Sequence, residues 1–359
     1  MSTKIQEADK LVEEAEKHLK TGFFKWRPDY DSAASCFQKA GILYKNAKCH
    51  EKASATFLKL ADSHYRNQSR FHAGKAYEEA AQVYKDMKDF SKALAHFDHA
   101  SELYLEDGTP DTAAMCLDRA GKIVEMNHPD WAISSYMKAA QIYENEDESR
   151  FRSAAELVGK VARLQVKLNK LSEAVKSITH EKQLLSQVQG GDHGAGSRLT
   201  CALVLVHLHI GDQVRAEQSI FDACDSIVGF GESEEYHALQ NLIEAFDERN
   251  EEKAAQLLNM PLFKYMDTAY AKLARSLHVQ GYTESSSQQK HIFSKGVNKQ
   301  NMAQLSEQFD NMADKMAYLQ ASVPTVTDSE LQSSNTNIPP NAMPPTHESR
   351  DVAEEIDLC

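Results

Sequence analysis

The feature that most constrains this fold is a repeated pair of residues, an alanine followed four positions later by a tyrosine. The pairs are Ala40/Tyr44, Ala61/Tyr65, Ala80/Tyr84, Ala100/Tyr104 and Ala139/Tyr143. Successive alanines are 21, 19, 20 and 39 residues apart, and Ala120, with Val124 in place of tyrosine, marks the missing step. Positions i and i+4 share one helix face, so each pair predicts a small notch beside a large knob.

A step of about 20 residues is long enough for one helix and a short turn, so two steps make an antiparallel hairpin of about 40 residues. A fixed period in this range is typical of an α-solenoid, in which each repeat packs only on its neighbours. An ordinary alanine-rich bundle is the alternative. The near-constant phase of five pairs favours the solenoid.

Apolar spacing and turn signals place the helices. The first is expected from about residue 3 to residue 20. The next eight are expected at about 30–46, 50–66, 70–87, 91–106, 110–126, 130–145, 150–168 and 171–187. The solenoid is therefore predicted to span 1–190.

A glycine-rich stretch at 190–196 predicts a flexible break. It lacks the Gly-Lys-Ser/Thr of a phosphate loop. A C-terminal helical bundle is expected at 191–280, with helices near 198–210, 213–226, 233–248, 251–259 and 262–278.

The remainder, 281–359, is rich in Ser, Gln, Asn and Pro and is predicted to be a mostly disordered tail. One amphipathic helix is expected at about 298–320, because apolar residues recur there every three or four positions: Met302, Leu305, Phe309, Met312, Met316 and Leu319. This helix either docks on the protein's own surface or binds a partner. The chain ends in an acidic terminus, 351–359.

Composition excludes several classes of protein. With 40 basic and 53 acidic residues, the net charge of −13 argues against a general nucleic-acid binder. The six cysteines show no CxxC or zinc-type spacing, which predicts reduced thiols and no metal site. We find no catalytic motif and expect neither an enzyme nor a cofactor. His207 and His209 lie two apart in an apolar helix, so they are expected to be core or rim histidines. No signal peptide or spanning segment is evident, so any membrane contact is expected to be peripheral.

Three large aromatic residues, Phe23, Phe24 and Trp26, lie in a predicted loop at 21–28. They could pack beneath the first hairpin. Alternatively, they could enter a membrane surface, with Lys25 and Arg27 facing anionic head groups.

Two charged clusters are also candidates. Lys160, Arg163 and Lys167 recur at helical spacing, and Lys122 could extend them into a cationic row for an acidic partner. The alternative is a solvated face. Acids crowd one helix end and the next helix start, as helix-dipole partners or as a docking patch for a basic partner: Glu244, Asp247, Glu248, Glu251 and Glu252.

Several stretches resemble the soluble attachment proteins of N-ethylmaleimide-sensitive factor (NSF), particularly their gamma form. The matching segments are 19–23, Trp26, 28–34, 104–115, 204–209 and 261–267. The resemblance covers about residues 1–280. It implies an all-α, right-handed solenoid of hairpins similar to tetratricopeptide (TPR) repeats, ending in a small helical bundle.

The resemblance also implies a function. Such proteins are adaptors that grip a four-helix SNARE bundle and recruit NSF, a hexameric AAA+ ATPase, for SNARE disassembly in vesicle traffic. The implied chain is a monomer by itself, cytoplasmic and peripherally membrane-associated. The rival is a TPR-type chaperone co-adaptor that binds acidic peptide tails, but its repeats are about 34 residues long.

Roles are implied position by position. Phe23, Phe24 and Trp26 match the membrane-attachment loop, and Lys160 matches the SNARE-facing surface. The acidic region from Asp247 to Glu252 falls where the family meets the ATPase. The chain's end matches the stimulating terminus: Glu354, Glu355, Asp357 and Leu358. Trp131 stands where the family usually has lysine, and the tail from about 280 to 350 is longer than the family's.

Overall fold

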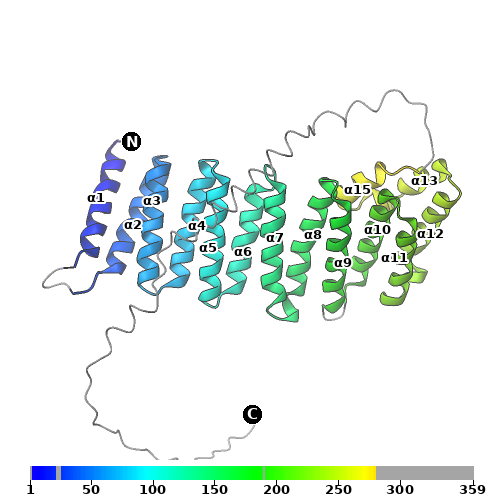
Figure 1. The fold of residues 1–359 in the computed structure, drawn as a ribbon, viewed down its shortest axis with the longest axis horizontal. Helices are drawn as coiled ribbons and strands as arrows, with labels where there is room; N and C mark the ends of the chain where they lie inside the picture. The colour runs from blue at the N-terminus through cyan, green and yellow to red at the C-terminus, as the bar shows by residue number, and fades with distance from the viewer. Residues whose placement is uncertain (1, 22–25, 189–190, 280–359) are drawn as a thin grey trace, which may run out of the picture. The chain divides into compact units, whose positions relative to one another are not determined.

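The fold is taken from a computed structural model that describes residues 2–21, 26–188 and 191–279. These residues fall within one compact unit, Met1–Ser286. Their regular structure consists of fifteen α-helices and two short 3-10 helices, with no strand among them. Successive helices pack side by side as antiparallel hairpins (Figure 1). The all-α class and the hairpin architecture are therefore confirmed.

The helix bounds show how regular the chain is. The first nine helices are α1 Ser2–Leu19, α2 Tyr30–Asn46, α3 His50–Arg66, α4 Arg70–Asp86, α5 Phe90–Glu106, α6 Pro110–Val124, α7 Pro129–Glu144, α8 Phe151–Lys167 and α9 Leu171–Gln187. They are followed by α10 His193–Ile210, α11 Gln213–Ser226, α12 Glu234–Asp247, α13 Glu251–Leu258, α14 Pro261–Lys264 and α15 Thr268–Arg275. The two 3-10 turns are η1 Glu148–Arg150 and η2 Phe230–Glu232.

An identical turn sets the period. Helices α2 to α5 are 17 residues long and begin 20 residues apart. Each is followed by a residue in the left-handed region, with φ of 57° to 76°: Lys48, Gln68, Lys88 and Gly108. After α2, the Lys48 amide donates to the Lys45 carbonyl and the next amide donates to the Tyr44 carbonyl, at 3.0 and 2.9 Å. This Schellman arrangement satisfies the last carbonyls of each helix and keeps the step constant.

The alanines behave as predicted. All six, with Ala120 included, are fully buried. The tyrosines match the prediction only in part. Tyr44 and Tyr104 are buried, whereas Tyr65 is 43% exposed and lies under the guanidinium of Arg70, 4.3 Å from its ring centroid. The prediction that Tyr65 is a knob filling a gap between helices is wrong. Tyr65 is the sixteenth residue of α3, whereas Tyr44 and Tyr104 are the fifteenth residues of their helices, so its side chain is turned by about 100° toward solvent.

Glycines in the first helix of each hairpin make close packing possible. A Cβ added at Gly41, Gly74 or Gly121 would come within 2.5 to 3.1 Å of a ring on the second helix, from Phe57, Tyr104 and Tyr136 respectively. In the hairpin α8–α9, Gly159 faces the carboxyl of Glu181 instead. We call these positions the glycine sockets.

Two C-terminal boundaries differ from the sequence predictions. The glycine-rich stretch was expected to be a break up to 196, but α10 begins at His193 because the Asp192 carboxylate caps it by accepting from Ala195 N–H at 3.0 Å. The helix expected at 262–278 is split into α14 and α15, because Asp267 caps a new start through Ala269 N–H.

The predicted division at 190 lies inside the compact unit and stays a prediction. The expected helix at 298–320 and the acidic terminus lie outside the described residues.

Candidate partner-binding surfaces

The predicted aromatic loop joins α1 to α2. Trp26 is 87% exposed, while Phe23 and Phe24 lie outside the described residues. The loop is closed at its base, because Asp29 N–H donates to the His18 carbonyl at 3.0 Å. Asp29 also caps α2 by accepting from Ser32 N–H. The membrane role of this loop stays a prediction.

The structure brings together two lysines of the predicted cationic row. Lys122 on α6 and Lys160 on α8 each place Nζ 2.5 Å from a different oxygen of Asp118. Lys160 also lies over the ring of Tyr136, 5.2 Å from its centroid. Burial opposes the ionised form of Asp118, but the hydrogen bonds and charge of both lysines together outweigh burial and lower the pKa of this carboxyl. The row is therefore not purely cationic here.

The other two cations of the row differ from each other. Arg163 is mostly buried, and its Nε lies 3.4 Å from Asp267, the residue that caps α15. Lys167 is exposed, and no ion pair is found for it within the described part of the chain. The two residues therefore have different roles: Arg163 joins α8 to the start of α15, and Lys167 faces solvent.

A wider pattern of charge pairs runs along the helical array and was missed at the sequence level. Several pairs join a helix to the next but one, with partners 34 to 43 residues apart. Along the even-numbered helices the pairs are Lys45–Glu79, Arg119–Glu78 and Lys160–Asp118. Along the odd-numbered helices they are Lys52–Asp9, Lys59–Glu16 and Lys138–Asp98. Opposite charges about one hairpin apart are the signal that could have revealed them.

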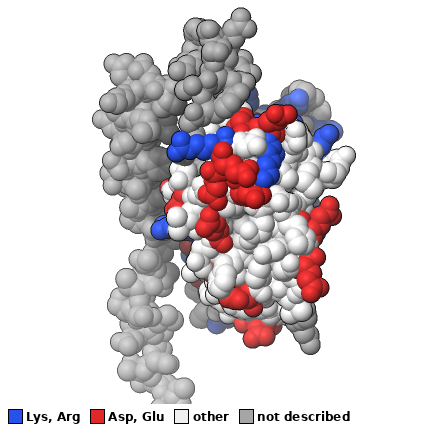
Figure 2. All heavy atoms as spheres, turned by 90° about the vertical axis from the view of Figure 1, so that its right-hand side faces the viewer, with Lys and Arg blue, Asp and Glu red and all other residues white. Residues whose placement is uncertain are grey.

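Acidic side chains gather near one edge of the end formed by α11 to α13 (Figure 2). Glu244 and Glu248 both pair with Lys253, at 2.7 and 3.2 Å. Glu251 is structural, because its carboxylate holds the His278 ring and accepts from Val279 N–H, both at 2.7 Å.

The remaining acids of the predicted patch face solvent. Asp247 accepts from Gln213, and Glu252 is exposed near the start of α13. Glu354, Glu355, Asp357 and Leu358 lie outside the described residues. The patch thus comprises Glu244, Asp247, Glu248 and Glu252 as surface acids.

A groove with a mixed polar and apolar lining adjoins this patch and was not anticipated. It has a volume of about 770 Å³ and lies between α11 and α12, where Glu244 and Asp247 form part of its lining. Val214 and Phe221, seven residues apart on α11, are 77% and 62% exposed and also line it. Two apolar residues on the outer face of a short helix were the signal available in the sequence.

A buried carboxyl lies where the array meets the C-terminal helices. Glu181 on α9 faces Gly159 and Arg163, and burial raises its pKa to about 7 although Arg163 opposes that rise. His207 is buried as expected, and burial lowers its pKa. Among the described helices, none has the length and apolar character needed to cross a bilayer.

Comparison with known proteins identifies a family and several relatives. The family model of soluble NSF attachment proteins matches residues 6–260. A gamma-soluble NSF attachment protein of Dictyostelium discoideum is 23% identical over 77% of this chain and 84% of its own length. The Arabidopsis thaliana gamma protein is 24% identical over 75% and 91%, and the mouse alpha protein 25% identical over 69% and 85%.

Among solved structures, BtubC from P. vanneervenii matches 62% of this chain and 89% of its own, at 18% identity and a TM-score of 0.33. A score that low supports no argument. The family match, by contrast, spans most of the helices described above, from α1 to α13. The chain belongs to the soluble NSF attachment protein family.

Proposed function

We propose that this protein is a non-enzymatic adaptor that binds a SNARE four-helix bundle and recruits the ATPase NSF to disassemble it. The observation that carries the proposal is the family match over residues 6–260, which includes nearly the whole helical array. A 40-residue hairpin repeat, twice the 20-residue step, also disfavours the chaperone co-adaptor, whose repeats are about 34 residues.

The SNARE bundle is expected to contact the even-numbered helices through Lys122, Lys160 and Lys167. Lys122 and Lys160 share one carboxylate, so together they still present a net positive charge. An acidic partner would compete with Asp118 for them. Such contacts add orientation and association rate more than raw affinity. Arg163 supports this surface from below through its pair with Asp267.

NSF is expected to dock on the end formed by α11 to α13. Surface acids there lie beside exposed Val214 and Phe221, so the end offers charge and an apolar anchor together. Residues 354–358 are expected to add the stimulating contact. Phe23, Phe24 and Trp26 are expected to hold the complex on a membrane from the cytoplasmic side. Each contact is weak, and simultaneous engagement raises the total affinity.

A pull-down, combined with an assay of ATP hydrolysis by NSF, tests the proposal. The full chain and a 1–280 truncation are each offered NSF and a SNARE bundle. We expect both proteins to capture the bundle and the truncation to stimulate ATP hydrolysis less. Failure of the full chain to capture either partner would refute the adaptor role.

A matched pair of triple variants tests whether the SNARE bundle binds the even-numbered helices. Replacing Lys122, Lys160 and Lys167 with Gln is expected to weaken bundle capture. Replacing Lys52, Lys59 and Lys138, which lie on the odd-numbered helices, removes the same charge and is expected to leave capture intact. Arg163 is retained in both, because its loss would leave Asp267 without its ion pair. Equal losses would mean that only overall charge matters.

A further inference from the structure

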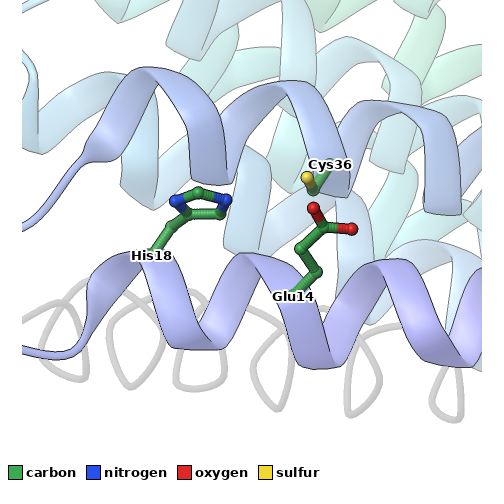
Figure 3. A group of neighbouring side chains, drawn as sticks. All are labelled: Glu14, His18 and Cys36. Carbon is green, nitrogen blue, oxygen red and sulfur yellow. The ribbon is translucent and has the colours of Figure 1, made fainter.

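Three metal-ligating side chains meet in the first hairpin. Glu14 and His18 lie one turn apart on α1, and Cys36 lies opposite them on α2 (Figure 3). One atom from each residue, a carboxylate oxygen, a ring nitrogen and the thiol sulfur, lies within 4.8 Å of the other two. Cys36 is only 9% exposed, whereas Glu14 is exposed and can adjust. The cluster is thus open on one side and closed on the other.

The orientation of His18 gives a second, independent indication. One ring nitrogen points toward Cys36 and Glu14, and the other points away from them (Figure 3). His18 Nδ1 lies 3.6 Å from an oxygen of Asp29. Asp29 is itself fixed, because its other carboxylate oxygen accepts from Ser32 N–H at 3.0 Å. A histidine that binds a metal through one nitrogen usually has a carboxylate on the other, which sets its tautomer and ring orientation.

We propose that Glu14, His18 and Cys36 form a site for a Zn²⁺-class transition metal, with Asp29 as the residue that positions His18. A set of one oxygen, one nitrogen and one sulfur ligand suits zinc and disfavours Mg²⁺ and Ca²⁺, which prefer oxygen. Three protein ligands leave the fourth tetrahedral position to water. Binding replaces the S–H bond of Cys36 with a metal–sulfur bond and releases the proton to solvent.

The separation of the ligands is compatible with this site. Zinc bonds of about 2.0–2.3 Å place tetrahedral ligand atoms roughly 3.3–3.7 Å apart. The observed limit of 4.8 Å requires a shift of about 1 Å, which a rotation of the exposed Glu14 side chain can supply.

The position of the site gives it a structural consequence. It bridges α1 to α2 next to the base of the loop that carries Trp26. Beyond α2, α1 is tied to the array by ion pairs of Asp9 with Lys52 and of Glu16 with Lys59, which are largely exposed. A bound metal would therefore hold the terminal helix against fraying. Spacing in the sequence could not reveal the site, because the ligands come from two helices.

The test uses the full chain and Co²⁺ as a spectroscopic probe, followed by Zn²⁺ titration. We expect a thiolate-to-cobalt charge-transfer band and the intense visible bands of tetrahedral cobalt. Cys36→Ser is expected to abolish the charge-transfer band, and Glu14→Gln to weaken Zn²⁺ binding. The matched controls are Cys49→Ser, which alters the cysteine before α3, and Glu13→Gln, which alters the residue next to Glu14. Both lie outside the cluster and are expected to change neither result.

The positioning role of Asp29 is tested by Asp29→Asn. Asparagine caps a helix as well as aspartate does. The variant is therefore expected to keep α2 while weakening Zn²⁺ affinity by about 10–100-fold. A charge-transfer band that persists in Cys36→Ser, or the absence of any band in the full chain, would overturn the proposal. So would Zn²⁺ affinities that are equal in the wild type and in Cys36→Ser.

Discussion

Two neighbouring hairpins, α6–α7 and α8–α9, each have a glycine socket, but the two sockets receive different side chains. In α6–α7 the socket at Gly121 receives the ring of Tyr136, which is fully buried and donates its hydroxyl to Glu125 at 2.7 Å. In α8–α9 the socket at Gly159 receives the carboxyl of Glu181. One oxygen of Glu181 has no hydrogen-bond partner within the described residues.

The difference shows how the last hairpin, α8–α9, is connected to the C-terminal helices. The ring of Tyr136 fills its socket and also packs under Lys160 of the next hairpin, but among the described residues it makes no link to the C-terminal helices. The carboxyl of Glu181 faces Arg163, which in turn pairs with Asp267 of the C-terminal helices. The second arrangement sacrifices packing for a polar connection, and such a buried carboxyl makes stability depend on pH.

The largest expected effect comes from filling the socket of α6–α7. Gly121→Ala places a Cβ 2.5 Å from the Tyr136 ring, which cannot retreat because it is fully buried and held by Glu125. We expect a loss of about 3 kcal/mol in the free energy of unfolding, typical of overpacking. Urea denaturation measures it.

The matched variant Gly159→Ala sharpens the comparison. Its Cβ meets the Glu181 carboxyl and the Arg163 guanidinium, the ends of two flexible side chains. We expect a loss of about 1 kcal/mol, because these ends can shift and alanine favours the helix. Losses of equal size would mean that the two sockets are equally rigid.

The second effect depends on pH. The pKa of Glu181 is about 7 in the folded protein, against an ordinary value of 4.5, so the folded state binds more protons between these values. Stability contributed by the neutral carboxyl is complete below pH 4.5 and is lost as pH rises through 7. Glu181→Gln is therefore expected to stabilise the protein by about 2 kcal/mol at pH 8 and by less at pH 5.

The control for this effect is the other hairpin. Tyr136→Phe removes one hydrogen bond and is expected to cost about 1 kcal/mol equally at pH 5 and pH 8. Denaturant titrations at both pH values compare the two variants. A Glu181→Gln protein with the same stability change at both pH values would contradict the assignment.

A smaller effect concerns the turns of the same hairpins. Asn169, between α8 and α9, has φ of 57°, whereas no residue with positive φ occurs in the turn between α6 and α7. Asn169→Ala is expected to cost about 1 kcal/mol, because alanine adopts the left-handed region poorly. Asn127→Ala, in the other turn, is expected to change stability by less than about 0.5 kcal/mol. Thermal unfolding of both variants is the measurement, and a reversed order would be inconsistent with this account.

The smallest effect concerns the pair that joins the two hairpins. Lys160→Met removes one of the two lysines on Asp118, and Lys122 remains to compensate the carboxylate. Because the pair is partly exposed, we expect a loss of less than about 1 kcal/mol that diminishes further in high salt. Unfolding measured at low and high salt tests this. A large, salt-independent loss would instead indicate that packing on Tyr136 dominates.

The positions of the helices in the array could be predicted from the sequence alone, because they depend on interactions between residues close together in the chain. Alanine spacing, capping residues and turn signals placed the eight helices from α2 to α9 to within two residues, because these signals act within one helix and its turn. The family resemblance was also carried by contiguous stretches. The cationic and acidic clusters could be located for the same reason, as neighbours on single helices.

Tertiary structure decided which of these residues are available and what they touch. Asp118 takes both lysines, Arg163 turns to Asp267, and Glu251 anchors His278. The Glu14, His18 and Cys36 cluster likewise requires two helices to meet. Apart from the Asp118–Lys122 pair, which lies within α6, these contacts join residues that are distant along the chain or on different elements. A pattern within one helix cannot determine them, because the partner is set by how helices pack against each other.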